Sequence, residues 1–376
     1  MAADQDLAAW IRLTLVPGIG GETQRRLLKD FGLPENIFAA GYGSLRASAG
    51  DAAAQRLTTH DAAAEIEAAL AWAQEAGNHI VTLAHPDYPQ SLLAGVDPPV
   101  LLYVKGRVEL LNRPSLAIVG SRSATRQGEA NAEAFGKFLS EAGLTIVSGL
   151  ALGIDAAAHR GALQGSGSTV AVIGTGADRI YPAGNADLAR RIAEQGIIVS
   201  EFALGTPPLT GNFPRRNRII AGMSRGCLVV EAAERSGSLI TARLAAESGN
   251  DVFAIPGSIH SPLSKGCHKL IKQGAKLVDD AADIIEELRW EKAISPIERS
   301  EQAGSPAPGR GGGGPNLCAK RSEDEVLAAL GHDLCDLDTL CQRTGMSADA
   351  LLARLLPLEL EGHIAQLPGG RYQRLD

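Results

Sequence analysis

The central part of the chain alternates short apolar runs with longer segments of helical spacing. Most of the runs are apolar throughout, as expected of strands that a parallel sheet buries on both faces. The helical segments between them supply the crossovers that parallel strands need. The pattern predicts an α/β fold with a Rossmann-like, doubly wound, mostly parallel sheet over residues 78–290. Its strands are expected at residues 79–83, 100–106, 115–120, 144–149, 169–174, 197–201, 227–231, 252–257 and 275–278.

The segments on either side of this domain have a different pattern. Residues 1–75 have helical spacing that a glycine-rich break interrupts at residues 17–21, which indicates an all-helical domain of the helix-hairpin-helix or SAM-like type. Residues 291–316 are rich in Pro, Ser and Gly and are predicted to be a flexible linker. Residues 317–376 show three helical segments followed by two short strands around a Pro-Gly-Gly turn, which predicts a winged-helix domain.

The composition is that of a globular protein outside the membrane. Hydrophobic residues make up 45% of the 376 residues, and no apolar run reaches the length of about 18 residues that suggests a membrane span. The acidic start of the chain lacks the features of a signal peptide, so we expect a cytoplasmic protein. The five cysteines are odd in number and scattered, and their spacing fits no usual zinc site, so neither disulfides nor a metal are expected.

The distribution of charge points to a polyanion partner for one segment only. The net charge is −7, and residues 1–75 and 317–376 each carry six basic and ten acidic side chains. Residues 213–276, in contrast, carry ten basic and four acidic side chains. This excess favours a nucleic-acid contact in that segment, although a solvated basic face would have the same composition. For the two acidic flanking domains we expect protein contacts or a minor role in nucleic-acid binding.

Glycine and serine residues follow several of the predicted strands. In open α/β sheets, ligands bind beyond the carboxyl ends of the strands, where backbone N–H groups at helix starts favour phosphate oxygens. The loops that could do this contain Gly120, Ser121 and Arg122, then Gly149, then Gly174, and finally Gly257 and Ser258. No dinucleotide fingerprint and no Walker lysine are present, which disfavours NAD and ATP, so we expect no cofactor.

The segment 213–224 places several arginines at the expected start of a helix, where positive charge is unfavourable. Pro214 suits the first turn of a helix, so Arg215, Arg216, Asn217 and Arg218 would crowd the helix start, where the dipole disfavours cations. Such violations often mark function, since arginines grip phosphate and Phe213 could stack on a base. In the alternative interpretation, one arginine pairs with Glu201 or Glu231 and Phe213 belongs to the core. A second candidate cluster contains Arg235, Ser236, Gly237, Ser238 and Lys265.

No constellation in the sequence demands a catalysed reaction. Asp155 and His159 lie four residues apart on a predicted helix and could pair, but a capping Asp with a structurally satisfied His is the commoner arrangement. Neither a G-x-S-x-G elbow nor an H-E-x-x-H motif occurs. We therefore expect a protein that is not an enzyme and has no catalytic residue.

Several long strings resemble the DprA/Smf family of DNA-processing proteins. They include IVGSR at 118–122, IVSGLALGIDAAAHRGAL at 146–163, FPRRNRIIAGMS at 213–224, EAAERSGSLITARLAAE at 231–247 and IPGSIHSPLSKGCHKLIKQGA at 255–275. The resemblance implies single-stranded DNA binding, protection of incoming DNA during natural transformation, loading of RecA recombinase, and a homodimer through the Rossmann-like domain. By motif position it implies a pocket lined by Arg122, Phe213, Arg216, Asn217, Arg218 and Lys265.

The rival hypothesis is an enzyme on a related Rossmann-like fold, a nucleotide-monophosphate phosphoribohydrolase. Such an enzyme should carry a Pro-Gly-Gly-x-Gly-Thr loop with a nearby acidic residue. The comparable place here is residues 234–241, with the sequence ERSGSLIT, which is related but altered.

Overall fold

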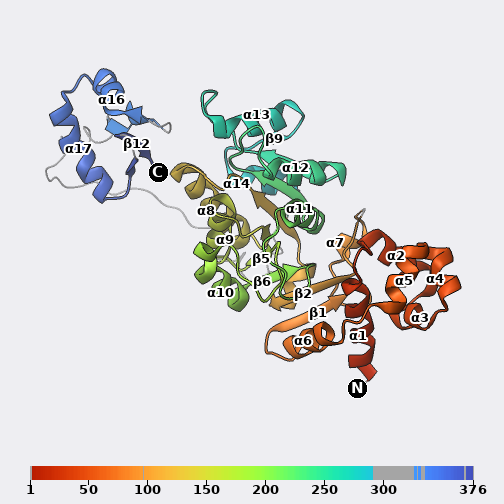
Figure 1. The fold of residues 1–376 in the computed structure, drawn as a ribbon. Helices are drawn as coiled ribbons and strands as arrows, with labels where there is room; N and C mark the ends of the chain where they lie inside the picture. Colours follow the sequence, from red (N-terminus) through yellow and green to blue (C-terminus); the bar gives the residue numbers. More distant parts are fainter. Residues whose placement is uncertain are drawn as a thin grey trace, which may run out of the picture. The chain divides into compact units, whose positions relative to one another are not determined.

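The computed structural model describes residues 2–95, 97–290, 326–327, 329–331, 335–367 and 370–375. They belong to two compact units. One unit contains the N-terminal helices and a nine-stranded sheet, and the other contains the winged-helix segment (Figure 1). The predicted linker at residues 291–316 lies outside the described residues.

All nine predicted runs of the central domain form strands. Most of these strands end one to three residues before the predicted end, and in six of them the predicted last residue, a Gly or a Glu, belongs to the loop that follows. The strands are β1 (Asn78–Thr82), β2 (Leu101–Gly106), β3 (Ser115–Val119), β4 (Thr145–Ser148), β5 (Thr169–Val172), β6 (Ile197–Ser200), β7 (Gly226–Val229), β8 (Asp251–Ala254) and β9 (Lys276–Leu277).

The strand order is β1-β2-β6-β5-β4-β3-β7-β8-β9. Strands β3 to β9 run parallel, whereas β2 is antiparallel to both β1 and β6. From β3 the chain first builds the sheet outward through β4, β5 and β6, and then returns to add β7, β8 and β9 on the other side. The predicted doubly wound, mostly parallel fold is therefore confirmed, and its topological switch point lies between β3 and β7.

Helices cover both faces of the sheet, as the fully apolar strands require. On β5, Val170 and Val172 belong to the same buried cluster as Ile219 of α11 (Asn212–Met223). Ala171, between them, faces the opposite way and packs with Leu188 of α10 (Ala186–Gln195). Helix α9 (Ile154–Ala162) joins α10 on one face, and α12 (Ser238–Glu247) joins α11 on the other (Figure 1). Four further helices belong to this part of the chain: α7 (Gln90–Leu93), α8 (Arg126–Glu141), α13 (Lys265–Lys272) and α14 (Ala281–Glu287).

The N-terminal segment is all helical, as predicted. Its helices are α1 (Ala2–Leu15), α2 (Gly21–Phe31), α3 (Pro34–Ala39), α4 (Tyr42–Ala49), α5 (Asp51–Thr59) and α6 (Ala63–Ala73). The hairpin between α1 and α2 turns at Gly18, whose φ of +71° favours glycine. Trp10 and Trp72 pack with Ile80 and Tyr103 of the first two strands, so these helices share an apolar cluster with the sheet.

The C-terminal unit has the predicted winged-helix form. Its described elements are β10 (Cys335–Asp336), α16 (Leu337–Thr344), α17 (Ala348–Leu360), β11 (Ile364–Leu367) and β12 (Arg371–Arg374), with the strand order β10-β12-β11. Leu340, Leu355 and Tyr372 are buried in its own core. The first predicted helix of this unit lies partly outside the described residues. In the part of the chain that the structure describes, no helix is long and apolar enough to cross a membrane.

Helices α8 and α9 approach each other closely at Gly161, which gives a stability prediction. A Cβ atom at Gly161 would overlap the backbone carbonyl of Glu133 in α8, whereas a Cβ at Gly43 in α4 would meet nothing within 4 Å. We expect Gly161→Ala to lower the free energy of unfolding by about 1–3 kcal/mol through overpacking. The control Gly43→Ala should raise it by up to about 1 kcal/mol, because alanine favours the helix. Urea unfolding measures both, and equal effects would contradict the close approach.

Candidate nucleic-acid interface

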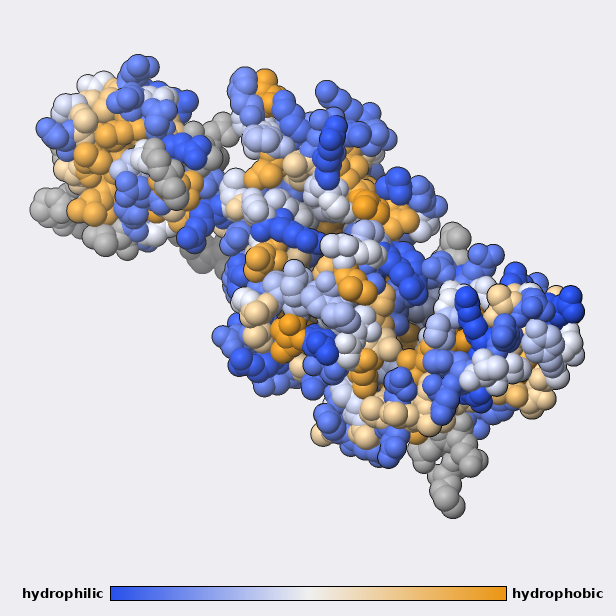
Figure 2. Space-filling view, in the orientation of Figure 1, coloured by the Kyte–Doolittle hydropathy of each residue, from blue (hydrophilic) through white to orange (hydrophobic). Residues whose placement is uncertain are grey.

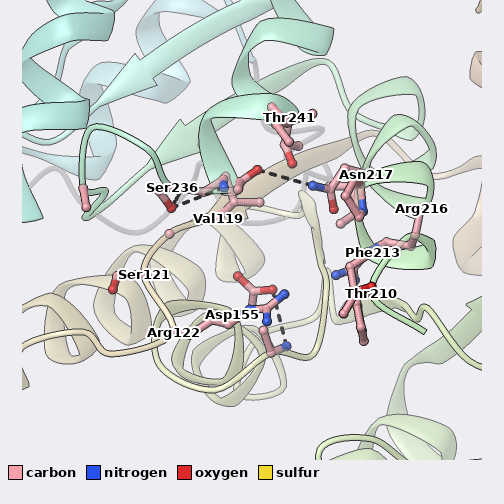
Figure 3. A pocket seen from close by; sticks show the side chains of 18 of the residues that line it. Val119, Ser121, Arg122, Asp155, Thr210, Phe213, Arg216, Asn217, Ser236 and Thr241 are labelled. Atoms are coloured by element: carbon pink, nitrogen blue, oxygen red, sulfur yellow. Dashed lines mark hydrogen bonds between the residues drawn. The ribbon is translucent and has the colours of Figure 1, made fainter. Parts of the chain in front are cut away.

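A pocket of about 620 Å³ lies at the switch point of the sheet. It is bounded by the loop after β3, the loop after β7 and the start of α11 (Figure 3). This is the position at which open α/β sheets bind ligands, because the two neighbouring loops diverge to opposite faces there. Ten of the sixteen predicted site residues line it: Gly120, Ser121, Arg122, Phe213, Arg216, Asn217, Arg235, Ser236, Gly237 and Ser238.

The start of α12 forms one wall of the pocket. The Ser236 hydroxyl lies 2.7 Å from the Ser238 hydroxyl, and Asn217 donates its side-chain N–H to the Gly237 carbonyl at 3.4 Å (Figure 3). The loop before α12 is thus held against α11. Because α12 begins at Ser238, the positive end of its dipole and its first N–H groups are directed at the pocket, an arrangement that favours an anion.

Arg122 and Arg235 are the exposed cations of the pocket. Among the described residues, no carboxylate lies within salt-bridge distance of either guanidinium. The Arg122 guanidinium lies 5.3 Å from the centre of the Phe213 ring. These two side chains can therefore meet a phosphate without first giving up an ionic partner.

Arg216 lies in the floor of the pocket and is only 4% exposed. It donates a hydrogen bond to the Val172 carbonyl at the end of β5, and its guanidinium fills the space that a Cβ at Gly149 would need. Burial lowers the pKa of Arg216 to about 10, and nearby Asp155 opposes this shift. Gly149 therefore makes room for Arg216 and does not itself line the pocket.

Arg215 and Arg218 do not line the pocket. Both pair with Glu201, whose side chain is 3% exposed, and Arg218 also lies 2.9 Å from the Asp97 carboxylate. Burial raises the pKa of Glu201, and Arg218 and then Arg215 oppose this shift. This is the structural arrangement that the sequence left open, in which arginines of this helix are partners of Glu201.

The remaining predicted residues follow β8 and lie outside the pocket. Lys265 donates its ammonium N–H to the Ile259 carbonyl, and the His268 ring lies 2.9 Å from the Gly257 carbonyl. Ser258 belongs to the same loop, on the far side of β7 from the switch point. None of the three predicted residues lines the pocket, although the backbone N–H of Gly266, next to Lys265, donates to the Ala232 carbonyl in the loop after β7.

Asp155 and His159 are structural and do not pair with each other. The Asp155 carboxylate accepts N–H groups of Gly149 and Ala151 at 3.1 and 3.4 Å, so it holds the loop before its own helix. The His159 ring lies 2.7 Å from the Thr169 hydroxyl and is fully buried. Burial raises the pKa of Asp155 and lowers the pKa of His159 to about 3, so the imidazole is neutral in the folded protein. Among the described residues, no group of three or more His, Cys, Asp or Glu could hold a metal ion.

Comparison with known proteins identifies the family. Residues 79–289 match the family DNA recombination-mediator protein A, and residues 319–370 match the DprA winged helix domain. The chain belongs to the DprA/Smf family. Protein Smf of Escherichia coli (strain K12) is 44% identical over 311 residues, which are 82% of this chain and 81% of that protein.

Two solved DprA structures are similar to this one. The X-ray structure of DprA from Streptococcus pneumoniae has a TM-score of 0.67 and 41% identity, and the match covers 74% of this chain and 97% of that chain. The DprA structure from Helicobacter pylori, which concerns a single-stranded DNA binding mode, has a TM-score of 0.51 and 31% identity. That match covers 56% of this chain and 95% of the other.

Among the pocket residues that the sequence analysis did not predict, Tyr181 is the aromatic one. Tyr181 lines the pocket and is 44% exposed, and its ring centre lies 5.7 Å from that of Phe213. It lies in an irregular loop after β5, where helical or strand periodicity gives no information. The one available signal is an aromatic residue in a predicted loop, which is notable because only 4% of the residues are aromatic.

The ion pairs of Arg218 predict a loss of stability in this DprA-family protein. Arg218→Ala should lower the free energy of unfolding by about 1–3 kcal/mol, because Glu201 stays buried with Arg215 as its remaining arginine. Adding Glu201→Gln should restore part of the loss by removing the buried charge. Arg235→Ala, the exposed control, should change stability by less than about 0.5 kcal/mol. Thermal melts measure all three, and an unchanged Arg218→Ala would contradict a structural role.

The lowered pKa of the buried His159 should make the stability of the protein depend on pH. Its pKa falls from 6.5 in the unfolded chain to about 3 in the folded protein, so between these values only the unfolded chain binds the proton. The free energy of unfolding should therefore fall on acidification below pH 6.5, by up to about 1.4 kcal/mol per pH unit from this group. His159→Gln should remove this slope in urea unfolding between pH 6 and 5. Replacing the exposed His79 by Gln should leave the slope in place.

Proposed function

We propose that this protein binds single-stranded DNA in the pocket at the switch point and acts there as a recombination mediator. The observation that carries the proposal is the meeting of two exposed arginines, Arg122 and Arg235, with the N-terminus of α12 around one pocket. Cations and backbone N–H groups at a helix start are what a chain of phosphates requires. The membership in the DprA/Smf family and the similarity to the H. pylori structure support the same ligand.

The pocket suits a single strand of any sequence better than a duplex. Its polar groups are backbone N–H groups, serine hydroxyls and arginines, which meet phosphate and sugar and do not distinguish bases. Two aromatic side chains, Phe213 and Tyr181, stand at the pocket and can contact only a base that is not paired and stacked in a duplex. We therefore propose sequence-tolerant binding with a preference for single strands.

Further parts of the proposal rest on the family resemblance. They are protection of incoming DNA during natural transformation, loading of RecA on the bound strand, a homodimer formed through the Rossmann-like domain and a cytoplasmic location. RecA filament formation on strands covered by a single-strand binding protein tests the loading role. Light scattering of the full chain tests the dimer.

The proposal assigns no catalytic residue. Asp155, the acidic side chain among the residues that line the pocket, supports the loop 149–151 through its carboxylate. A nucleotide hydrolase would need an acidic side chain of the pocket that is free to act on a substrate, whereas this one already accepts two backbone N–H groups. Incubation with a panel of nucleoside monophosphates tests this rival directly, since release of free nucleobase would favour the enzyme and overturn the assignment.

The central test is binding to single and double strands over a salt series. We expect fluorescence anisotropy to give tighter binding to a labelled oligonucleotide than to the duplex of the same sequence. Arg122→Ala and Arg235→Ala should each weaken binding to all sequences by a similar factor. In each variant the plot of log affinity against log salt concentration should also become less steep, by about 0.7 in slope, because one phosphate contact is lost.

Arg107→Ala provides the matched control for these two variants. Arg107 is a half-exposed arginine that follows β2 and donates to the Gln195 carbonyl, at the edge where the parallel strand β6 begins. Because this is the opposite edge of the sheet, its removal should leave the salt slope unchanged. Tighter binding to duplex, or unchanged slopes for both pocket variants, would contradict the proposed site.

A further inference from the structure

The two aromatic residues at the pocket differ in how much of each ring is free. Phe213 packs against the backbone of Gly174, since a Cβ there would come within 2.9 Å of the ring. The Arg122 guanidinium lies 5.3 Å from the centre of the same ring, and Tyr181 lies 5.7 Å from it at an interplanar angle of 39°. Three neighbours therefore surround Phe213, and its side chain is half-buried.

Tyr181, in contrast, packs against Phe213 and keeps much of its side chain exposed. Its contact with Phe213 is within the usual separation of packed aromatic pairs, so no base fits between the two rings. The side chain is nevertheless 44% exposed and lines the pocket. Phe213 thus supports the Tyr181 ring, and the exposed part of that ring is available for a planar ligand.

The loops around Tyr181 carry exposed apolar side chains. Leu152, Ile180 and Leu209 are 48%, 47% and 54% exposed and belong to the loops that follow β4, β5 and β6. Figure 2 shows that hydrophobic residues on the displayed face form separate patches among hydrophilic ones. The three residues belong to loops at the same edge of the sheet, where they offer apolar contacts to a ligand.

The edge of the sheet is therefore divided by chemistry. Arg122 and Arg235 follow β3 and β7, whereas Tyr181 and the three apolar residues follow β4, β5 and β6. A single strand of DNA has the same division, with charged phosphates on one side and apolar base faces on the other. A strand with its phosphates toward β3 and β7 would place its bases over β4 to β6.

We propose that Tyr181 is the residue on which a nucleobase stacks, with Phe213 as the positioning residue that supports its ring. This inference rests on the proposed function and adds to it the place of the bases. It moves the stacking role from Phe213, which the sequence suggested, to a residue of the loop after β5.

The test compares two ligands that differ only in their bases. Affinities are measured for an oligothymidylate and for an oligomer of the same length in which every sugar is abasic. Tyr181→Ala should weaken binding of the oligothymidylate by about 5- to 150-fold, the effect of losing one stacked base, and change the affinity for the abasic oligomer little. The salt slope should stay as in the unchanged protein, because no phosphate contact is lost.

Three further variants complete the design. Tyr181→Phe should retain the affinity, because it keeps the ring, whereas Tyr181→Leu should lose it, because it keeps only apolar bulk. Tyr42→Ala removes a tyrosine of similar exposure, 43%, from helix α4 and should leave both affinities unchanged.

Each outcome decides one of the two proposals. An equal loss for both oligomers, or full affinity of Tyr181→Leu for the oligothymidylate, would overturn the stacking role while leaving single-stranded DNA binding in place. If the unchanged protein binds neither oligomer, the proposed function itself fails, and the role of Tyr181 with it.

Discussion

The position of β3 in the sheet determines where this protein can bind a ligand. The chain builds outward from β3 in one direction and then in the other, so the loops after β3 and β7 must diverge to opposite faces of the sheet. A crevice between them is a consequence of this topology and needs no special side chain. What the sequence adds is chemistry: short residues that keep the crevice open, and arginines on both of its sides.

The cationic start of α11 is tolerated because most of its charge is neutralised inside the protein. Arg215 and Arg218 share the buried Glu201, and Arg216 lies near Asp155. Without these acids, three arginines in the first two turns would repel one another and the helix dipole. The helix is therefore mainly an internal framework for the pocket, and the charge offered to a ligand comes from the loops after β3 and β7.

The sequence predicts the strands well, but it predicts the directions of the pocket side chains poorly. Strands such as β5 are almost entirely apolar, with Thr169 as its one polar residue, and this pattern determines both their position and their burial on two faces, so the fold was predictable. Arg215, Arg216 and Arg218 are adjacent in sequence, but successive helical residues point about 100° apart. Only contacts with Val172, Glu201 and Asp97 show their directions. Tyr181 belongs to a loop without periodicity. Lys265 begins helix α13 after β8, one strand beyond the two that border the pocket, and the sequence alone does not give this strand order.

The two tryptophans of the N-terminal helices have a consequence for the integrity of the protein. Strand β1 is an edge strand, and edge strands with apolar surface invite pairing with other chains. Here Trp10 and Trp72 cover Ile80, Leu101 and Tyr103 of the first two strands. The helical segment therefore shields apolar side chains of the first two strands from solvent and from other chains. Without this segment, apolar side chains of the first two strands would be exposed beside the edge strand, which favours association with other chains.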